Sequence, residues 1–419
     1  SKKCKEENEM AETNSILEQM FRDKVSKMDY SMSQEAKEDT GYPTGFLNFD
    51  YLNGFINDQK TSDGEMKQYF VLGITDGSYN VLIGNTGCGK STLVTQIAAN
   101  IARQFKTTTI FEDNIEGGMT TARRRSLSGF SLEEYNKRYI VRNTGVTAEN
   151  FYERIKMIHD LKVGNPEKFL YDTKRNDVYG SPIMKLEPTI YILDSIPMLM
   201  PKEYADDDEL AGKSSGAATA QILTRIFRQI IPLLKEANII LFGINHILEE
   251  VQMTMFPKAN PVPYLKQGER LPRGRSATYV ANNIIRLDAK TKLKSDEGYK
   301  IEGSIVEISL VKSRSSGKKL GARLVYDFAN GFDPWLSLLE DLKANKLIYG
   351  GGASLSFDID KVHKFSYGTF REKVLSDPEF RGAFLGVVLD RLKKIPQPIQ
   401  LAEESHTDEL LSSDALYEV

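Results

Sequence analysis

The sequence predicts an α/β fold in which a mainly parallel, twisted sheet is flanked by helices, with a short N-terminal arm and a small, mostly helical C-terminal region. Apolar runs of strand length alternate with segments of helical periodicity, which is typical of parallel sheets. A glycine-rich stretch also joins one such run, 79–83, to a helical segment at 92–102. This order places the loop at the carboxyl edge of the sheet, where α/β proteins bind ligands.

Length, charge and cysteine content limit the class of protein. The 419 residues exceed one compact core of average size, so one large domain with smaller additions is expected. A net charge of −3 excludes a uniformly basic nucleic-acid binder, so any contact with DNA must come from local basic patches. Two cysteines fit a reducing compartment. No apolar run reaches the roughly 18 residues of a membrane span. Because the N-terminus also lacks the apolar core of a signal peptide, we expect a cytoplasmic protein without a membrane partner.

The glycine-rich stretch has the spacing G-x-x-x-x-G-K-S, the phosphate-binding loop of P-loop NTPases. Its glycines let backbone N–H groups turn toward an anion, and the following helix N-terminus adds partial positive charge. Lys90 is expected to reach the β- and γ-phosphates of ATP, and the Ser91 hydroxyl to bind Mg²⁺. The predicted nucleotide-binding residues are Gly84, Asn85, Thr86, Gly87, Cys88, Gly89, Lys90, Ser91 and Thr92.

The remaining elements follow in chain order. Turn residues at 41–46 precede a largely apolar stretch at 47–55, and Pro232 is expected to bend a helix or mark its last turn. Residues 163–188 are expected to be a surface insertion. Further strands are expected at 107–111, 189–195, 238–244, 283–287, 304–311 and 322–328, the last two pairing as a hairpin, and helices at 151–158, 218–236, 338–347 and within 366–395.

Four regions are expected along the chain. Residues 1–40 form a charged arm that is either partly disordered or contains a short helix that docks on a neighbouring subunit. The ATPase core spans 41–345, and a small C-terminal domain at 346–398 follows it through a linker at Gly350-Gly351-Gly352. The end of the chain, 399–419, is an acidic flexible tail that could compete with DNA for basic surface.

Polar residues at strand ends supply the other parts that ATP hydrolysis needs. Asp194 ends an apolar strand and is expected to hold Mg²⁺ through water. Glu112, Asp113 and Glu116 follow another strand, and each qualifies by position as the general base. His246 ends a further strand, where it could sense the nucleotide.

Several of these stretches resemble RecA-type recombinases, most closely the bacteriophage UvsX-type recombinases. The resemblance covers roughly residues 41–345 and rests on motifs that occur in the family's order: 116–127, 189–195, 245–246, 310–314 and 330–335. It implies that Glu116, rather than Glu112, activates the attacking water. It also implies host cytoplasm if the chain is phage-encoded.

The resemblance further implies that ATP lies between subunits. Lys312 and Arg314 stand where the family places the basic pair that completes the neighbour's site, as an arginine finger does in trans. Arg123 stands where the family often uses a tyrosine against the adenine, and a guanidinium can stack there too.

Two loops would bind DNA in such a protein. The first, 198–217, is acidic at 206–209, which is unfavourable beside phosphates. The second, 247–278, interleaves basic residues with aromatic ones, which suits single-stranded DNA. Its basic residues are Lys258, Lys266, Arg270, Arg273 and Arg275.

The function expected from these features is that of a DNA-dependent ATPase recombinase that uses ATP and Mg²⁺. It would form a helical filament on single-stranded DNA and exchange strands with homologous duplex DNA, with mediator and single-strand-binding proteins as further partners. A DnaB-type hexameric helicase, which forms a ring, is the main alternative, because 43–46 resembles the entry to its ATPase domain as well. The N-terminal arm is short for that family's separate N-terminal domain. A nucleotide-regulated module such as a recombination mediator is a third class, but it has no need of a long DNA-gripping loop.

Overall fold

The computed structural model describes residues 39–177, 180–205, 215–249, 260–272, 276–317, 320–351 and 354–395. The chain divides into two compact units, 1–39 and 40–419, and the second unit contains all the elements below. Most of the predicted arm, the acidic tail and the acidic stretch 206–209 lie outside the described residues. Within the described ranges, no helix is both long and apolar enough to cross a membrane.

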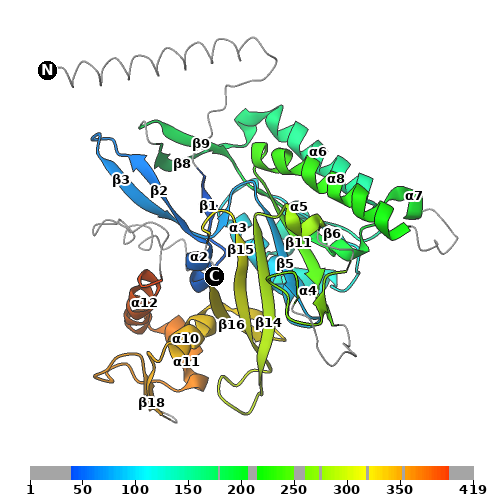
Figure 1. Ribbon diagram of the computed structural model, residues 1–419. Coiled ribbons are helices and arrows are strands. Elements are labelled where there is room, and N and C mark those ends of the chain that lie inside the picture. Colours follow the sequence, from blue (N-terminus) through cyan, green and yellow to red (C-terminus); the bar gives the residue numbers. More distant parts are fainter. Residues whose placement is uncertain are drawn as a thin grey trace, which may run out of the picture. The chain divides into compact units, whose positions relative to one another are not determined.

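A nine-stranded sheet organises the second unit, in the order β17-β16-β15-β14-β5-β11-β10-β6-β7 (Figure 1). The strands from β14 to β7 pair in parallel, whereas β14 to β17 pair antiparallel. Their bounds are β5 Tyr79–Gly84, β6 Ile110–Asn114, β7 Tyr139–Arg142, β10 Thr189–Asp194, β11 Ile239–His246, β14 Asn283–Leu293, β15 Gly303–Ser313, β16 Gly321–Asp327 and β17 Gly331–Asp333.

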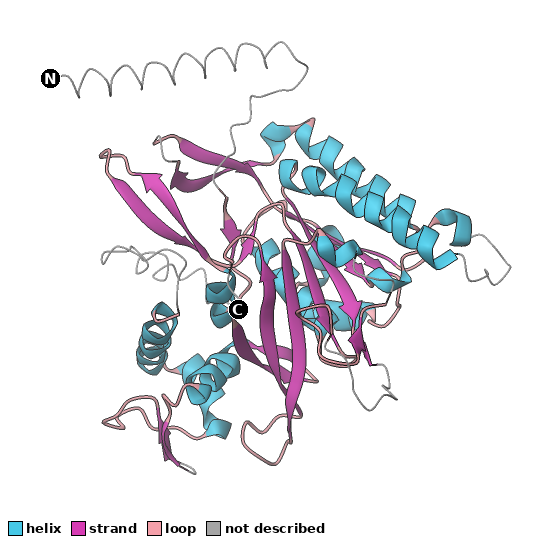
Figure 2. Ribbon diagram, in the orientation of Figure 1, coloured by secondary structure: helices cyan, strands magenta, loops and turns pink. Residues whose placement is uncertain are grey.

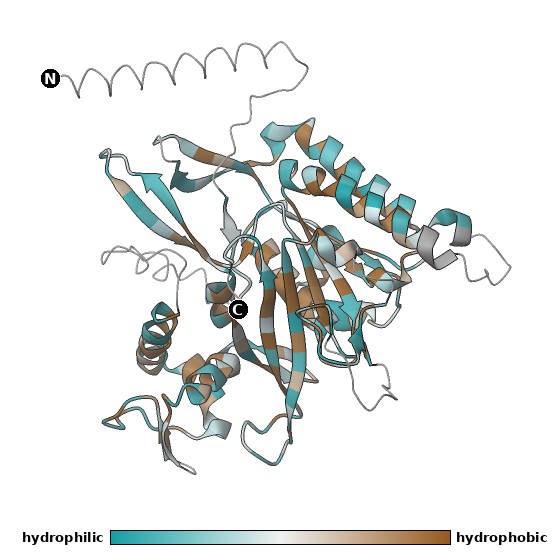
Figure 3. Cartoon of the chain, in the orientation of Figure 1, coloured by the Kyte–Doolittle hydropathy of each residue, from teal (hydrophilic) through white to brown (hydrophobic). Residues whose placement is uncertain are grey.

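Helices cover both faces of this sheet, because its parallel strands are apolar on both sides (Figure 3). Alternate residues point to opposite faces. Leu82 and Ile192 thus belong to the core under α3 (Lys90–Arg103), whereas Val81 and Leu193 belong to the core under α6 and α8. The other helices are α2 Leu47–Asn53, α4 Thr121–Ser128, α5 Leu132–Arg138, α6 Ala148–Val163, α7 Lys202–Ala205, α8 Ser215–Glu236, α9 Ser276–Tyr279, α10 Pro334–Ala344, α11 Tyr367–Ser376 and α12 Pro378–Lys393, with 3₁₀ turns at Pro166–Lys168 and Ile196–Met198.

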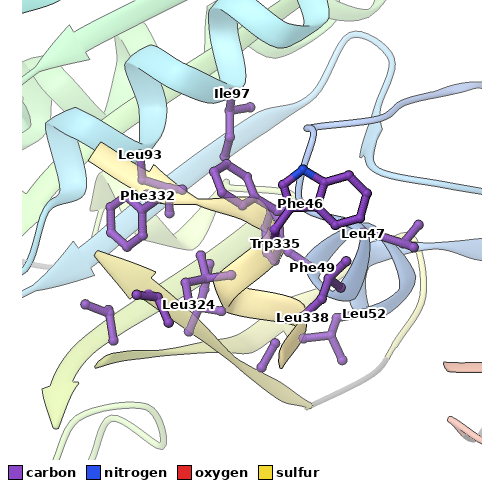
Figure 4. Packing of buried hydrophobic residues seen from close by; sticks show 14 of the residues in the cluster. Phe46, Leu47, Phe49, Leu52, Leu93, Ile97, Leu324, Phe332, Trp335 and Leu338 are labelled. Atoms are coloured by element: carbon purple, nitrogen blue, oxygen red, sulfur yellow. The ribbon is translucent and has the colours of Figure 1, made fainter. Parts of the chain in front are cut away.

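Aromatic side chains pack α2, α3 and α10 together in the core under α3 (Figure 4). Phe46 and Phe332 meet edge to face at 6.3 Å between ring centroids. A Cβ atom at Gly89 would lie 2.8 Å from the Phe332 ring, and Gly89 has φ of 87°, so only glycine fits at the start of α3. The packing of this core therefore fixes where α3 begins.

Short two-stranded pairings surround the sheet (Figure 2). Two of them, the β2–β3 and β8–β9 hairpins, lie side by side, since Lys60 N donates to Asp177 O at 2.9 Å. The paired strands are β1 Gly41–Tyr42 with β4 Ile74–Thr75, β2 Phe55–Lys60 with β3 Met66–Val71, β8 Leu170–Asn176 with β9 Pro182–Leu186, β12 Leu248–Glu249 with β13 Glu269–Arg270, and β18 Tyr349–Gly351 with β19 Ser354–Ser356.

The α/β class, the mostly parallel sheet and the predicted hairpin of β15 with β16 are confirmed. The predicted strand at 107–111 is shifted and begins at Ile110. The helix expected at 338 begins at Pro334 instead, because the Asp333 carboxylate caps it by accepting from Leu336 N at 2.9 Å. The linker prediction is wrong for Gly350 and Gly351, which pair with Leu355 and Ser354.

Candidate functional site

The 84–91 loop connects β5 to α3, as the spacing predicted. Gly87 and Gly89 have φ values of 81° and 87°, which let the loop turn back on itself. The Lys90 ammonium lies inside this turn and donates to the carbonyls of Gly84 and Asn85, each at 2.9 Å. Lys90 is only 5% exposed, and burial lowers its pKa. The loop thus encloses a cation at a helix N-terminus, which suits an anionic ligand.

Ser91 and Asp194 meet at this helix start. Ser91 Oγ donates to Asp194 Oδ2 at 2.6 Å. The other carboxylate oxygen, Oδ1, is buried and has no hydrogen-bond partner among the described residues. Burial raises the pKa of Asp194 to about 6. A hydroxyl beside a buried carboxylate with one unpaired oxygen fits Mg²⁺, which prefers oxygen ligands.

Glu116 and His246 lie next to this pair. His246 Nε2 is 3.0 Å from one Glu116 carboxylate oxygen, and Glu116 N donates to Asp194 O at 3.2 Å. His246 pairs with Gly84 on the adjacent strand, which brings it to the loop. Its Nδ1 is buried without a hydrogen-bond partner in the described part of the chain. Three strand ends and the loop therefore bring Lys90, Ser91, Asp194, Glu116 and His246 together.

The two other candidate bases have structural partners. Glu112 is buried, paired with Arg124 at 2.8 Å and hydrogen-bonded by Tyr139 Oη at 2.7 Å. Asp113 is buried on the opposite face, where it pairs with Arg154 and accepts from Tyr191 Oη. The Glu116 side chain is 40% exposed. Of these three carboxylates, Glu116 is the one open to solvent and able to meet a water molecule.

Arg123 is held beside the loop by backbone carbonyls. Its guanidinium donates to Ala329 O and, at 3.0 Å, to Phe328 O. The Phe328 ring is 47% exposed and lines a cleft of about 330 Å³ with residues 85–88 of the loop. Sequence reasoning selected Arg123 but missed Phe328, because a single phenylalanine after a strand carries no local signal.

Lys312 and Arg314 lie toward the amino ends of the sheet's parallel strands, whereas the 84–91 loop lies at their carboxyl ends. Lys312 Nζ and Arg314 Nη2 donate to Tyr279 O at 2.7 and 3.2 Å. Burial, and then the neighbouring Arg314, lower the pKa of Lys312 to about 8. The Tyr279 side chain is 70% exposed, with Lys312 Nζ 5.9 Å from its ring centroid. The pair is therefore not part of the loop's own site, and Tyr279 was missed by sequence reasoning.

The structure describes two of the five basic residues predicted to bind DNA. Lys266 is exposed, with its ammonium 3.2 Å from Asp288, and Arg270 is an exposed residue of β13. Lys258, Arg273 and Arg275 lie outside the described residues.

Asp194→Asn is expected to stabilise the ligand-free chain by about 1–3 kcal/mol at pH 7.5, because the burial that raises the pKa of Asp194 penalises its charged form. The gain should shrink as pH falls from about 6 to about 4, since the folded wild type then becomes protonated at this group. Thermal unfolding of both proteins across this pH range measures it. A variant that melts below wild type at pH 7.5 would contradict the prediction.

The fold and this cluster define the class broadly, as an α/β protein whose mostly parallel sheet is compatible with a Rossmann-like or RecA-like core. No protein-family model matches the chain, and no curated protein matches it either.

Proposed function

We propose that this chain is a DNA-dependent ATPase recombinase of the RecA type. The observation that carries the proposal is that the candidate ATPase residues divide between the two ends of the sheet's strands. Lys90, Ser91, Asp194, Glu116 and His246 gather at one end, while Lys312 and Arg314 gather at the other. Such a division suits ATP that binds between successive subunits of a filament.

Each residue at the loop has a task in hydrolysis. The buried Lys90 ammonium attracts and orients the β- and γ-phosphates. Ser91 Oγ and the Asp194 carboxylate would hold Mg²⁺, which neutralises charge on the phosphates when bound. Glu116 accepts a proton from the water that attacks the γ-phosphorus, giving ADP and phosphate. His246 Nε2, 3.0 Å from Glu116, orients that carboxylate.

DNA binding is assigned to the 247–278 loop. Its described basic residues, Lys266 and Arg270, are exposed. The start of the loop lies next to the 84–91 loop, since Ile247 N donates to Gly84 O at 3.2 Å. Lysine and arginine neutralise backbone phosphates. The Tyr264 ring is half-buried against the core under α6 and α8, so among the described residues of the loop the basic side chains support the proposal.

Electron microscopy with single-stranded DNA and a slowly hydrolysed ATP analogue tests the proposal. We expect open helical filaments, and strand exchange when labelled homologous duplex DNA and ATP are added. Duplex DNA of unrelated sequence is the control and should not exchange. Closed six-membered rings that unwind forked DNA would instead identify a DnaB-type helicase.

A further inference from the structure

One buried arginine on β14 ties the 247–278 loop to the sheet. Arg286 is 5% exposed, and it uses all five of its N–H donors. Two go to the Glu269 carboxylate at 2.6 and 2.7 Å, two to the Asp288 carboxylate at 3.0 Å each, and one to Tyr264 O at 3.0 Å. Glu269 and Tyr264 belong to the 247–278 loop, so the guanidinium fixes two separate points of it.

The same arginine is in register with the strand that leads into the 84–91 loop. Arg286 pairs with Ile83, and Leu287 pairs with Gly84. The approach is close, since a Cβ atom at Gly84 would lie 2.5 Å from Leu287 O. Any shift of the loop's first residue is therefore transmitted to the backbone beside Arg286.

A second chain of contacts also connects the 84–91 loop to Glu269. Asn85 Nδ2 donates to Glu249 Oε1 at 3.4 Å, and Glu249 pairs with Glu269 between β12 and β13. The Glu269 carboxylate in turn forms the ion pair with Arg286. The path thus runs from the 84–91 loop through Glu249, Glu269 and Arg286 and back to the loop.

The Arg286 cluster is rigid for electrostatic reasons. Although burial opposes ionisation, the hydrogen bonds from Arg286 hold the pKa of Glu269 below its usual value. A bidentate arginine–carboxylate pair fixes orientation as well as distance, and a lysine in its place supplies neither the fork nor the second carboxylate contact. Breaking one partner of a buried pair leaves an uncompensated charge, so separating Arg286 from Glu269 is unfavourable.

We infer that Arg286 is a positioning residue that couples occupation of the 84–91 loop to the DNA affinity of the described segment 260–272. The inference rests on the proposed function and adds to it a residue through which nucleotide and DNA communicate. Arg286 touches neither ligand itself. It holds the described segment 260–272 in one arrangement relative to Gly84. A displacement of the 84–91 loop therefore displaces this segment, and the reverse also holds.

Arg286→Lys tests this coupling. The measured quantity is the ratio of single-stranded DNA affinity with a slowly hydrolysed ATP analogue to that without nucleotide. Coupled sites commonly give a ratio of about 5–150, which we expect for wild type. Arg286→Lys should bring it below about 3, while the affinity for the analogue without DNA stays within about threefold of wild type.

A matched control separates coupling from general loss of stability. Arg138 is half-buried, and its guanidinium donates to the carbonyls of Thr108, Phe105 and Ala102, away from both loops. Arg138→Lys should lower the thermal midpoint as Arg286→Lys does, yet keep the wild-type ratio. Glu269→Gln is a milder second variant at the same pair, and combining it with Arg286→Lys should add little further loss.

The outcomes separate this inference from the proposed function. A folded Arg286→Lys protein with the wild-type ratio overturns the inference alone. A wild-type ratio near unity, or wild type that binds no single-stranded DNA, overturns the proposed function together with the inference.

Discussion

Lys90→Met is expected to lower the rate of ATP hydrolysis by about 10²–10³-fold or more, because it removes the charge that stabilises the phosphates in the transition state. Methionine keeps most of the volume of the side chain inside the 84–91 loop, so the fold should survive. The carbonyls of Gly84 and Asn85 lose their donor, which costs some local order. Phosphate release under saturating ATP measures the rate, and circular dichroism checks the fold.

Lys162→Met is the matched control for this prediction. Lys162 is also a buried lysine whose ammonium donates to a backbone carbonyl, Glu187 O at 2.7 Å, and to Thr189 Oγ1 at 3.1 Å. These contacts lie at the amino end of β10, away from the 84–91 loop. Its removal should lower stability and leave the hydrolysis rate of the folded protein unchanged. Equal rates for Lys90→Met and wild type would show that the loop is not an ATPase site.

The 84–91 loop could be predicted from sequence because all of its determinants are contiguous. Strand, glycines, lysine and helix follow one another, and the local chain alone dictates their geometry. Asp194 and His246 could be predicted for a related reason. Each ends an apolar run, and parallel strands bring their carboxyl ends to one edge whatever their order in the sheet.

Features that depend on long-range register could not be predicted. In the sequence, Arg286 is an ordinary residue of an apolar strand. Its contact with Glu269 forms only because the pairing of β12 with β13 places Glu269 beside it. Strand position alone left Glu112, Asp113 and Glu116 open as bases, and only the family resemblance favoured Glu116. Only the partners Arg124, 12 residues after Glu112, and Arg154, 41 residues after Asp113, show that the first two are neutralised.

Lys312 and Arg314 are expected to act on the site of a neighbouring subunit, because they cannot reach their own. Lys312 pairs with Ile284, which pairs with Val81, three residues before Gly84. At about 3.3 Å per residue, Lys312 thus lies about 10 Å back along the strand from the start of the 84–91 loop. It is also two strands away across the sheet, and both side chains turn to Tyr279 O.

Mixing two inactive variants tests this arrangement. Glu116→Gln is defective at its own loop, and the Lys312→Ala/Arg314→Ala double variant is defective only toward its neighbour. Each should lose about 10³-fold or more of the ATPase rate on single-stranded DNA, the first because it lacks the general base and the second because it lacks the basic pair that acts in trans. In an equal mixture, a loop from the double variant meets a basic pair from Glu116→Gln at about one interface in four, so about a quarter of the wild-type rate should return.

The control mixture combines Glu116→Gln with Lys90→Met, which are defective at the same loop. No pairing of these two chains creates an intact site, so this mixture should stay inactive in any assembly. Recovery in the first mixture alone requires that the basic pair act across a head-to-tail interface. If neither mixture recovers although both variants coat DNA, Lys312 and Arg314 do not complete the neighbour's site. Their contact with Tyr279 then serves to hold the end of α9 against β15.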